Sequence, residues 1–529
     1  MRNQCKIIKK EKGLLPYHIQ PMTFFFSVFF IFGFVAVTIP FSTKFGDLFT
    51  WLLNLATGNF GWFLILTMNA LLFYSIYLAF SKYSGVRIGG QDAEPEFTTL
   101  AWYSMLFSAG LGIGLLFYGV AEPIYHFGAP PIGGVEAKTK EAAIVAMNFS
   151  YLHWGFHPWG AYCTVGLALA FATFNRGLPL SIRTAFYELI GDRIYGPLGN
   201  IVDIMATVAT LFGVATSLGI GAQQVNAGLH YLVGLPVNIL SQVIIIAVIT
   251  VFATISVVLG LDAGIKRASF INMIITGSLA AFVFIVGPTV FVADLCLEST
   301  GYYLEHLLSS GFWLETWNGT NWQNSWTLFY WCWWIGWAPF VGMFIGRISY
   351  GRTIREYVVG TILVPVVLSI LWFTLLGGSA LHIELFEGGG IAEAVQESLS
   401  VSIFKFLEHF VLAGFSSALA IMAVVIFFVT SSDSGSLVID MITAGGHKDP
   451  PRPQRVFWAV TEGVVGAVLL AGGGLVALQT ATVVSGLPFA VIVLLMCWSL
   501  QKSLKKYHQE YCAMPENPMA LKQSVEHDG

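Results

Sequence analysis

The stretch WTLFYWCWWIGWAPF, from Trp326 to Phe340, contains five of the chain's 16 tryptophans. On a helical wheel, most of its aromatic side chains fall within one arc of roughly 140°. The segment is therefore predicted to be a helix with a single aromatic face, and Trp331 lies outside the arc of that face. The residues on that face are Trp326, Phe329, Tyr330, Trp333, Trp334 and Trp337.

A second aromatic cluster, HWGFHPWGAY from His153 to Tyr162, places Trp154, Trp159 and Tyr162 on an arc of about 140°. Trp and Tyr are enriched at membrane–water interfaces, so two interfacial belts are one interpretation. A belt sits at one depth, however, and the first cluster extends over about 16 Å of helix. The other interpretation is an aromatic cage, because ring faces attract a quaternary ammonium group.

Composition excludes a soluble protein. The 529 residues are 56% hydrophobic and 11% charged, and uncharged apolar runs of about 20 residues recur, each long enough to span a bilayer. There is no basic block outside the termini and no nucleic-acid reader motif, so no nucleic-acid partner is expected. A membrane-embedded enzyme would need clustered ionisable groups, and the apolar runs supply too few. A ligand-sensing receptor has no supporting feature.

The chain is predicted to be an all-α polytopic membrane protein with one transmembrane domain, 22–501, between an N-terminal tail, 1–21, and a C-terminal tail, 502–529. An amphipathic helix is expected at approximately 296–314. Twelve spans are predicted at approximately 22–41, 60–81, 98–120, 142–174, 199–230, 237–260, 267–293, 325–346, 356–380, 405–431, 456–478 and 482–501.

Charge asymmetry predicts the orientation. With both termini in the cytoplasm, 22 of the 26 Lys and Arg residues fall on the cytoplasmic side. Only Lys44, Lys138, Lys140 and Lys405 remain outside. This bias predicts a multi-pass protein of the cell (inner) membrane with an even number of spans.

Three spans carry residues that interrupt helices. The third reads SAGLGIGLLFYG, Ser108 to Gly119, the eighth contains Gly336 and Pro339, and the tenth ends in FFVTSSDSGS, Phe427 to Ser436. The glycines can serve close helix packing or unwound backbone beside a cavity. The hydroxyls can bond their own helix or ligate a hard cation. Two broken helices favour a transporter with repeats at about 98–293 and 325–501 and a midplane site between them.

Four motifs closely resemble the signature of the betaine/choline/carnitine transporter family, over about residues 20 to 505. The most specific is WTLFYWCWWIGWAPFVGMFIGRISYGRTIREY, Trp326 to Tyr357. The others are AGLGIGLLFYGVAEP (Ala109 to Pro123), HWGFHPWGAY and FFVTSSDSGS. The resemblance implies a neurotransmitter:sodium symporter-like fold: two inverted five-helix repeats preceded by two extra helices. It also implies a homotrimer that works by alternating access.

The resemblance also implies a substrate site. The cage for a trimethylammonium head would be Trp154, Trp159, Tyr162 and Trp334, with Trp333, Trp337 and Phe329 along the neighbouring pathway. Backbone amides of the unwound third span would meet the substrate's anionic end, near Ala109, Gly110 and Leu111. Lys and Arg are absent from the predicted span cores, which favours a zwitterion. Glu122, before Pro123, is interpreted as capping or pairing at a helix end.

No cofactor is expected, but sodium-coupled relatives use two ion sites. The first resembles Ser108, Leu111, Phe427, Thr430 and Ser431 here. The second would use Thr210, Tyr162 and Phe340, but its other threonine position is Val214, which has no oxygen to offer. The expected function is sodium-coupled import of a small methylated onium zwitterion of the glycine betaine or trimethylamine N-oxide type. Val214 keeps a second hypothesis open, a sodium-independent exchanger of carnitine- or betaine-type compounds. Gly114 disfavours choline, since choline-preferring relatives tend to carry an aspartate there.

Overall fold

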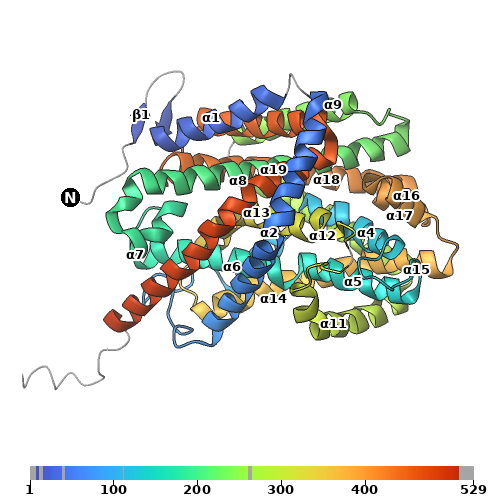
Figure 1. Cartoon of the computed structure of the whole chain (residues 1–529), viewed down its shortest axis with the longest axis horizontal. Coiled ribbons are helices and arrows are strands. Elements are labelled where there is room, and N and C mark those ends of the chain that lie inside the picture. The colour runs from blue at the N-terminus through green and yellow to red at the C-terminus, as the bar shows by residue number, and fades with distance from the viewer. Residues whose placement is uncertain are drawn as a thin grey trace, which may run out of the picture.

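The computed structural model describes residues 7–10, 16–38, 42–110, 112–259, 265–317 and 319–511. This part of the chain is almost entirely helical (Figure 1), as expected for an all-α polytopic membrane protein. A small hairpin at the N-terminus was not predicted: β1 (Ile8–Lys10) pairs antiparallel with β2 (Tyr17–Ile19).

The first half of the chain contains the helices up to α10. They are α1 (Pro21–Thr38), α2 (Ser42–Phe80), α3 (Thr99–Gly110), α4 (Ile113–Gly128), α5 (Lys140–Trp154), α6 (Phe156–Ala170), η1 (Phe171–Asn175), η2 (Ile182–Phe186), α7 (Tyr187–Ile190), η3 (Gly191–Tyr195), α8 (Pro197–Val233), α9 (Ile239–Leu259) and α10 (Ile265–Val286).

The second half begins with α11 (Thr289–Gly311), which overlaps the predicted amphipathic helix but starts earlier. The remaining helices are α12 (Trp322–Ser325), α13 (Thr327–Ile348), α14 (Ile354–Phe373), η4 (Thr374–Gly378), α15 (Ser379–Phe386), α16 (Ile391–Glu397), η5 (Leu399–Val401), α17 (Ser402–Leu407), α18 (Ala413–Thr443) and α19 (Arg452–Tyr511).

Eight helices of the described chain are long and apolar enough to cross a membrane: α2, α8, α9, α10, α12–α13, α14–α15, α18 and α19. These eight helices contain nine of the twelve predicted spans, because α19, which bends at Gly473 and Gly474, merges the last two. Of the other three, one is the shorter α1 and two are split into α3–α4 and α5–α6. The twelve-span count and the inverted repeats stay predictions.

The predicted interruptions have different outcomes. The third span is broken, because α3 ends at Gly110 and Gly112 is extended (φ −167°, ψ 177°) before α4 begins. The prediction that the eighth span is broken was wrong, and so was the expected end of the tenth span at about residue 431. The helix α13 runs through Gly336 and Pro339, and α18 continues past the hydroxyl run to Thr443. Neighbouring helices inside a bundle can satisfy the backbone that proline frees.

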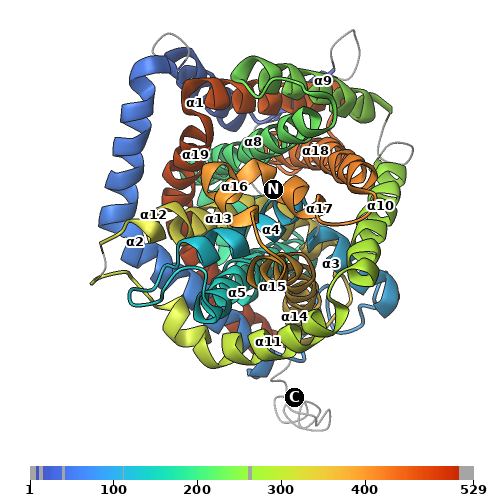
Figure 2. The ribbon, with the colours of Figure 1, turned by 90° about the vertical axis from the view of Figure 1, so that its right-hand side faces the viewer.

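The helices form a peripheral layer around a buried centre. Figure 2 shows α2, α1, α9, α10 and α11 on the outside, with α4 and α13 within. Burial agrees: 83% of the most apolar window of α12–α13 is buried, against 28% for α10. The hairpin β1–β2 and the end of α19 lie at one end of the molecule, and α16 and α17 at the other (Figure 1).

The two aromatic motifs meet where α6 crosses α13 closely. A Cβ atom added to Gly342 would lie 3.0 Å from the backbone nitrogen of Gly166, and one added to Gly346 would lie 2.7 Å from the Gly166 carbonyl oxygen. Glycines therefore let the two backbones approach in the way small residues allow in membrane helices. This contact sets the tryptophans of α13 beside those of α5 and α6.

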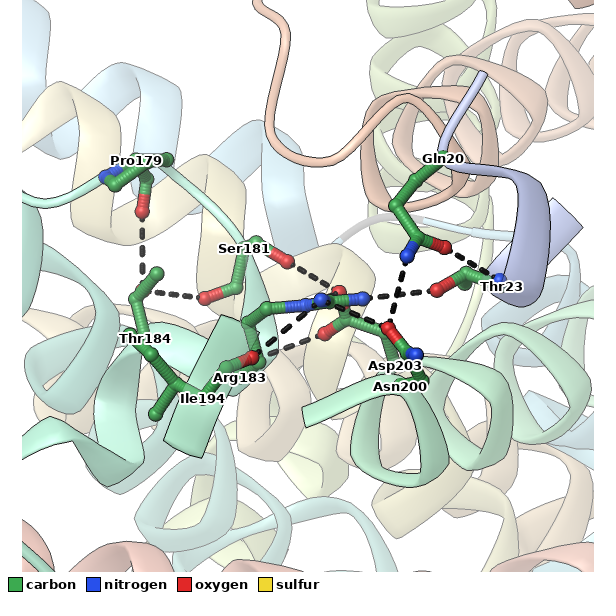
Figure 3. A network of polar contacts seen from close by, with 9 residues as sticks. All are labelled: Gln20, Thr23, Pro179, Ser181, Arg183, Thr184, Ile194, Asn200 and Asp203. Atoms are coloured by element: carbon green, nitrogen blue, oxygen red, sulfur yellow. Dashed lines mark hydrogen bonds and ion pairs between the residues drawn. The ribbon is translucent and has the colours of Figure 1, made fainter. Parts of the chain in front are cut away.

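A buried ion pair connects η2 with α8 at the end of the molecule that holds the hairpin (Figure 3). Arg183 of η2 donates from Nε to Asp203 of α8 at 2.6 Å, and both side chains are at most 1% exposed. Its other nitrogens donate to Asn200 at 3.0 Å and to Thr23 of α1 at 2.8 Å. Ser181 also donates to the Asp203 carboxylate at 2.7 Å. The network fixes α1, η2 and α8 relative to one another.

Candidate functional site

Tryptophans from α5, α6 and α13 form the walls of a buried aromatic site. The ring of Trp154 stands edge-on to that of Trp334, with centroids 4.8 Å apart and planes at 75°. Trp333 and Trp334 stack at 5.0 Å, and Tyr162 meets Trp334 edge-on at 6.2 Å. Trp159 lies edge-on to Tyr162 at 5.3 Å. The structure thus brings together all four residues of the expected cage.

Hydrogen bonds hold these rings in place. The indole N–H of Trp334 donates to the carbonyl of His153 at 2.8 Å, and that of Trp333 donates to the carbonyl of Gly213 at 3.3 Å. The indole N–H of Trp154 donates to the Glu122 carboxylate at 2.9 Å. These hydrogen bonds fix the orientation of the three rings.

The rings surround a cavity. Its described lining contains no charged side chain, and two serines, Ser217 and Ser369, were not predicted from the sequence. The break between α3 and α4 forms one wall of the cavity. The lining residues are Gly112, Ile113, Gly114, Leu115, Trp154, Pro158, Trp159, Tyr162, Ser217, Trp333, Trp334, Trp337, Val341 and Ser369.

Not every expected substrate residue lies on this wall. Phe329 is buried and stacks on Trp333, with centroids 5.4 Å apart, and it is not among the described lining residues. Leu111 and the side chains of Ala109 and Gly110 lie outside the described residues. The expected contact of the unwound span with an anion therefore stays a prediction.

A second cavity adjoins the first and shares Trp337 and Val341 with it. Four residues of the first expected sodium site line it: Ser108, Phe427, Thr430 and Ser431. The Thr430 hydroxyl donates to the carbonyls of Ile426 at 3.0 Å and Phe427 at 3.2 Å. Such donation leaves its oxygen lone pairs available to a cation.

The second expected sodium site stays a prediction. Tyr162 lines the first cavity, Phe340 lines the second, and Thr210 lies buried in α8 without a described hydrogen-bond partner. Val214 is not among the described lining residues of either cavity. A Cβ atom added to Gly435 would lie 3.0 Å from Val214 and 3.1 Å from a carboxylate oxygen of Glu462. Val214 therefore packs against α18 and α19.

A buried polar cluster lies directly behind the cage, and Glu122 pairs within it with His126 and His153, but the expected position of Glu122 at a helix end was wrong. Glu122 is inside α4, not at its end, and is 0% exposed. Its carboxylate accepts hydrogen bonds from Trp154, from the Tyr330 hydroxyl at 2.6 Å and from Nδ1 of His153 at 2.5 Å. An acid within an apolar span is rare and marks a site, which is the signal that the sequence offered.

The two histidines of this cluster also contact side chains other than Glu122. Nε2 of His153 is 2.9 Å from the Thr327 hydroxyl, and Nδ1 of His126 accepts from the indole N–H of Trp322 at 3.3 Å. One ligand atom each of Glu122, His126 and His153 lies within 4.8 Å of the others, a spacing that a metal ion could also use. The hydrogen bonds account for the arrangement as it stands.

Comparison with known proteins agrees with this geometry. A family model described as betaine/carnitine/choline family transporter matches residues 22–509. The chain is similar to a glycine betaine transporter of Acinetobacter baylyi, 42% identical over 92% of this chain and 74% of the relative. It is also similar to a glycine betaine/proline/choline transporter of Vibrio parahaemolyticus, 43% identical over 89% of this chain and 87% of the relative. The glycine betaine transporter OpuD of Bacillus subtilis is 40% identical over 86% of this chain and 88% of its own length.

Proposed function

Because the chain belongs to the betaine/carnitine/choline family of transporters, we propose that it is a sodium-coupled symporter. It imports a small methylated onium zwitterion, of the glycine betaine or trimethylamine N-oxide type, by alternating access. The chain is a multi-pass membrane transporter and not an enzyme. The specific substrate, the ion and the mechanism are the parts that we propose.

The observation that carries the substrate proposal is the aromatic cavity. Edge-to-face tryptophans and a tyrosine line it, and its described wall has no Lys or Arg to repel an onium group. Ring faces attract a cation that cannot lose its charge by deprotonation. Relatives named as glycine betaine transporters support the same substrate class.

The second cavity supports sodium coupling. Its hydroxyl and carbonyl oxygens, from Ser108, Phe427, Thr430 and Ser431, are the hard donors that an alkali cation prefers. The two cavities share Trp337 and Val341, so occupancy of one can affect the shape of the other. A shared wall is one way in which binding at one site can affect binding at the other.

Uptake by purified protein in liposomes tests the proposal. Radiolabelled glycine betaine and trimethylamine N-oxide are supplied with and without an inward sodium gradient. Uptake that depends on the gradient is the expected result. Uptake without sodium, stimulated by substrate loaded inside, would instead establish exchange.

Replacing Trp334 by leucine should weaken binding of every methylated onium ligand by similar factors. About 0.5–2 kcal/mol of cation–π attraction is shared by all of them, which corresponds to roughly two- to thirtyfold in affinity. Equilibrium binding of glycine betaine, trimethylamine N-oxide and carnitine measures the effect. Trp62→Leu, on the exposed side of α2, is the matched control. Loss of one ligand with another spared would contradict a shared cage.

Replacing Ser431 by alanine should raise the sodium concentration that half-saturates uptake by about fivefold, since one coordinating oxygen contributes about 1 kcal/mol. The uptake rate at saturating sodium should change less than the half-saturating sodium concentration does. Ser416→Ala is the control, because that hydroxyl on the same helix bonds its own backbone at Leu412 and Ala413. An unchanged sodium dependence would remove Ser431 from the coupling site.

A sodium-independent exchanger is the second candidate, and Val214 is the observation that favours it. Its side chain offers no oxygen and packs near Gly435 and Glu462, so the second ion site lacks a ligand.

We also propose that the protein is a homotrimer in the cell (inner) membrane with both termini cytoplasmic. The charge asymmetry supports this orientation. Exposed Leu297, Leu304 and Leu308 on α11 support contact of that helix with lipid or with a second copy. Mass measurement in detergent tests the trimer.

A further inference from the structure

Glu122 is the acidic residue of α4, and it lies on the face of that helix that looks toward the cage. Gly114, Tyr118, Glu122 and His126 recur at a spacing of four residues, so they share one face of the helix. Gly114 is part of the cavity wall, and the Tyr118 ring lies 6.0 Å from that of Trp154. Glu122 follows one turn beyond Tyr118.

Three hydrogen-bond donors converge on the two oxygens of Glu122. Trp154 Nε1 (2.9 Å) and the Tyr330 hydroxyl (2.6 Å) meet Oε2, while His153 Nδ1 (2.5 Å) meets Oε1. Nε2 of His126 lies 3.5 Å from Oε1, within ion-pair distance but without a hydrogen bond. The indole N–H can only donate, so Trp322 fixes Nδ1 of His126 as an acceptor and puts the hydrogen on Nε2. This donor set suits an ionised carboxylate.

The charge of this carboxylate has no fixed cationic partner. Within the described chain, neither a lysine nor an arginine pairs with Glu122, and its ion-pair contacts are the two histidines. Burying a charge without a counter-charge is costly. An onium group in the cage would supply that counter-charge.

Glu122 reaches the cavity through the rings themselves. Trp154, which it anchors, is a cage wall, and Tyr330, which it also anchors, stacks on Trp334 at 5.8 Å and 20°. A negative charge at the indole N–H adds to the electron density of the ring face. It also acts on the cavity directly through a low-dielectric interior.

We propose that Glu122 is the buried anion that complements the cationic head of the substrate, acting through Trp154 and Tyr330. It is a positioning and selectivity residue, because it touches the rings and not the substrate. The proposal rests on the proposed onium substrate. It explains how a cavity with an uncharged lining can select a charged head over a neutral group of the same shape.

The test compares two ligands of one shape. Glycine betaine carries a trimethylammonium head, and 3,3-dimethylbutanoate carries a tert-butyl group in its place with the carboxylate retained. Equilibrium binding of both to the purified full-length transporter, the second by competition, is measured for the unchanged protein and for Glu122→Gln. Glutamine keeps the shape and an acceptor oxygen but removes the charge.

The expected result is that Glu122→Gln weakens binding of glycine betaine about tenfold and weakens binding of 3,3-dimethylbutanoate, whose head is uncharged, less than twofold. Equal weakening of both ligands would overturn the proposal and leave Glu122 a structural support. An unchanged betaine affinity would also overturn it. If the unchanged protein binds no betaine, the proposed function itself fails, which is a separate result.

A second variant keeps the test decisive if Glu122→Gln does not accumulate. Glu122→Asp retains the charge, so it should keep most of the preference for betaine over the isostere even if both bind more weakly. Loss of that preference in Glu122→Asp would contradict the proposal.

Discussion

Gly114→Ala is expected to lower the affinity for glycine betaine by more than tenfold. A Cβ atom at this position would lie 2.5 Å from Cη2 of Trp154 and 3.1 Å from Cη2 of Trp333. Neither ring can yield easily, because Trp154 is hydrogen-bonded to Glu122 and packed edge-on against Trp334. Overpacking of this kind costs about 1–3 kcal/mol, and here it falls on the cage wall itself.

Binding of radiolabelled betaine to the purified variant measures the loss. Gly277→Ala on α10 is the matched control, because a Cβ atom there would meet nothing within 4 Å. That control should bind as the unchanged protein does. If Gly114→Ala bound betaine normally, Trp154 would be free to move and the cage would not be preorganised.

Arg183→Met is expected to destabilise the protein by about 3–5 kcal/mol, because it leaves the Asp203 carboxylate buried without its partner. Both side chains are at most 1% exposed, and the guanidinium also donates to Thr23 and Asn200 (Figure 3). The effect is measured as a change in the unfolding temperature of the purified protein in detergent. The readout is the fraction of protein that remains monodisperse after heating.

Two comparisons sharpen this test. Arg347→Gln breaks the exposed pair with Glu96, whose partners are 46% and 41% exposed, and should change the unfolding temperature little. The double variant Arg183→Met with Asp203→Leu removes both charges and should recover much of the lost stability. Equal stability of Arg183→Met and the unchanged protein would mean that water reaches Asp203.

Local pattern was enough for the aromatic face and for the third span. Helical periodicity placed Trp333, Trp334 and Trp337 on one side, and the alternating glycines predicted the break that separates α3 from α4. Both depend on the geometry and intrinsic stability of a single helix. The same reasoning failed for α13, where Pro339 lies within a continuous helix.

The sequence by itself determined the membrane class, the family and the residue types of the cage, because these follow from composition, periodicity and motif. Tertiary structure alone decided what surrounds them. At the break at Gly155, the hydroxyl of Tyr303 of α11 accepts the N–H of Phe156 at 3.2 Å, although the two lie far apart in sequence. Glu122 meets its donors from α5 and α13 in the same way. Hydrogen bonds between distant segments leave no local periodic signal, so only the folded chain reveals which buried charge lies behind which ring.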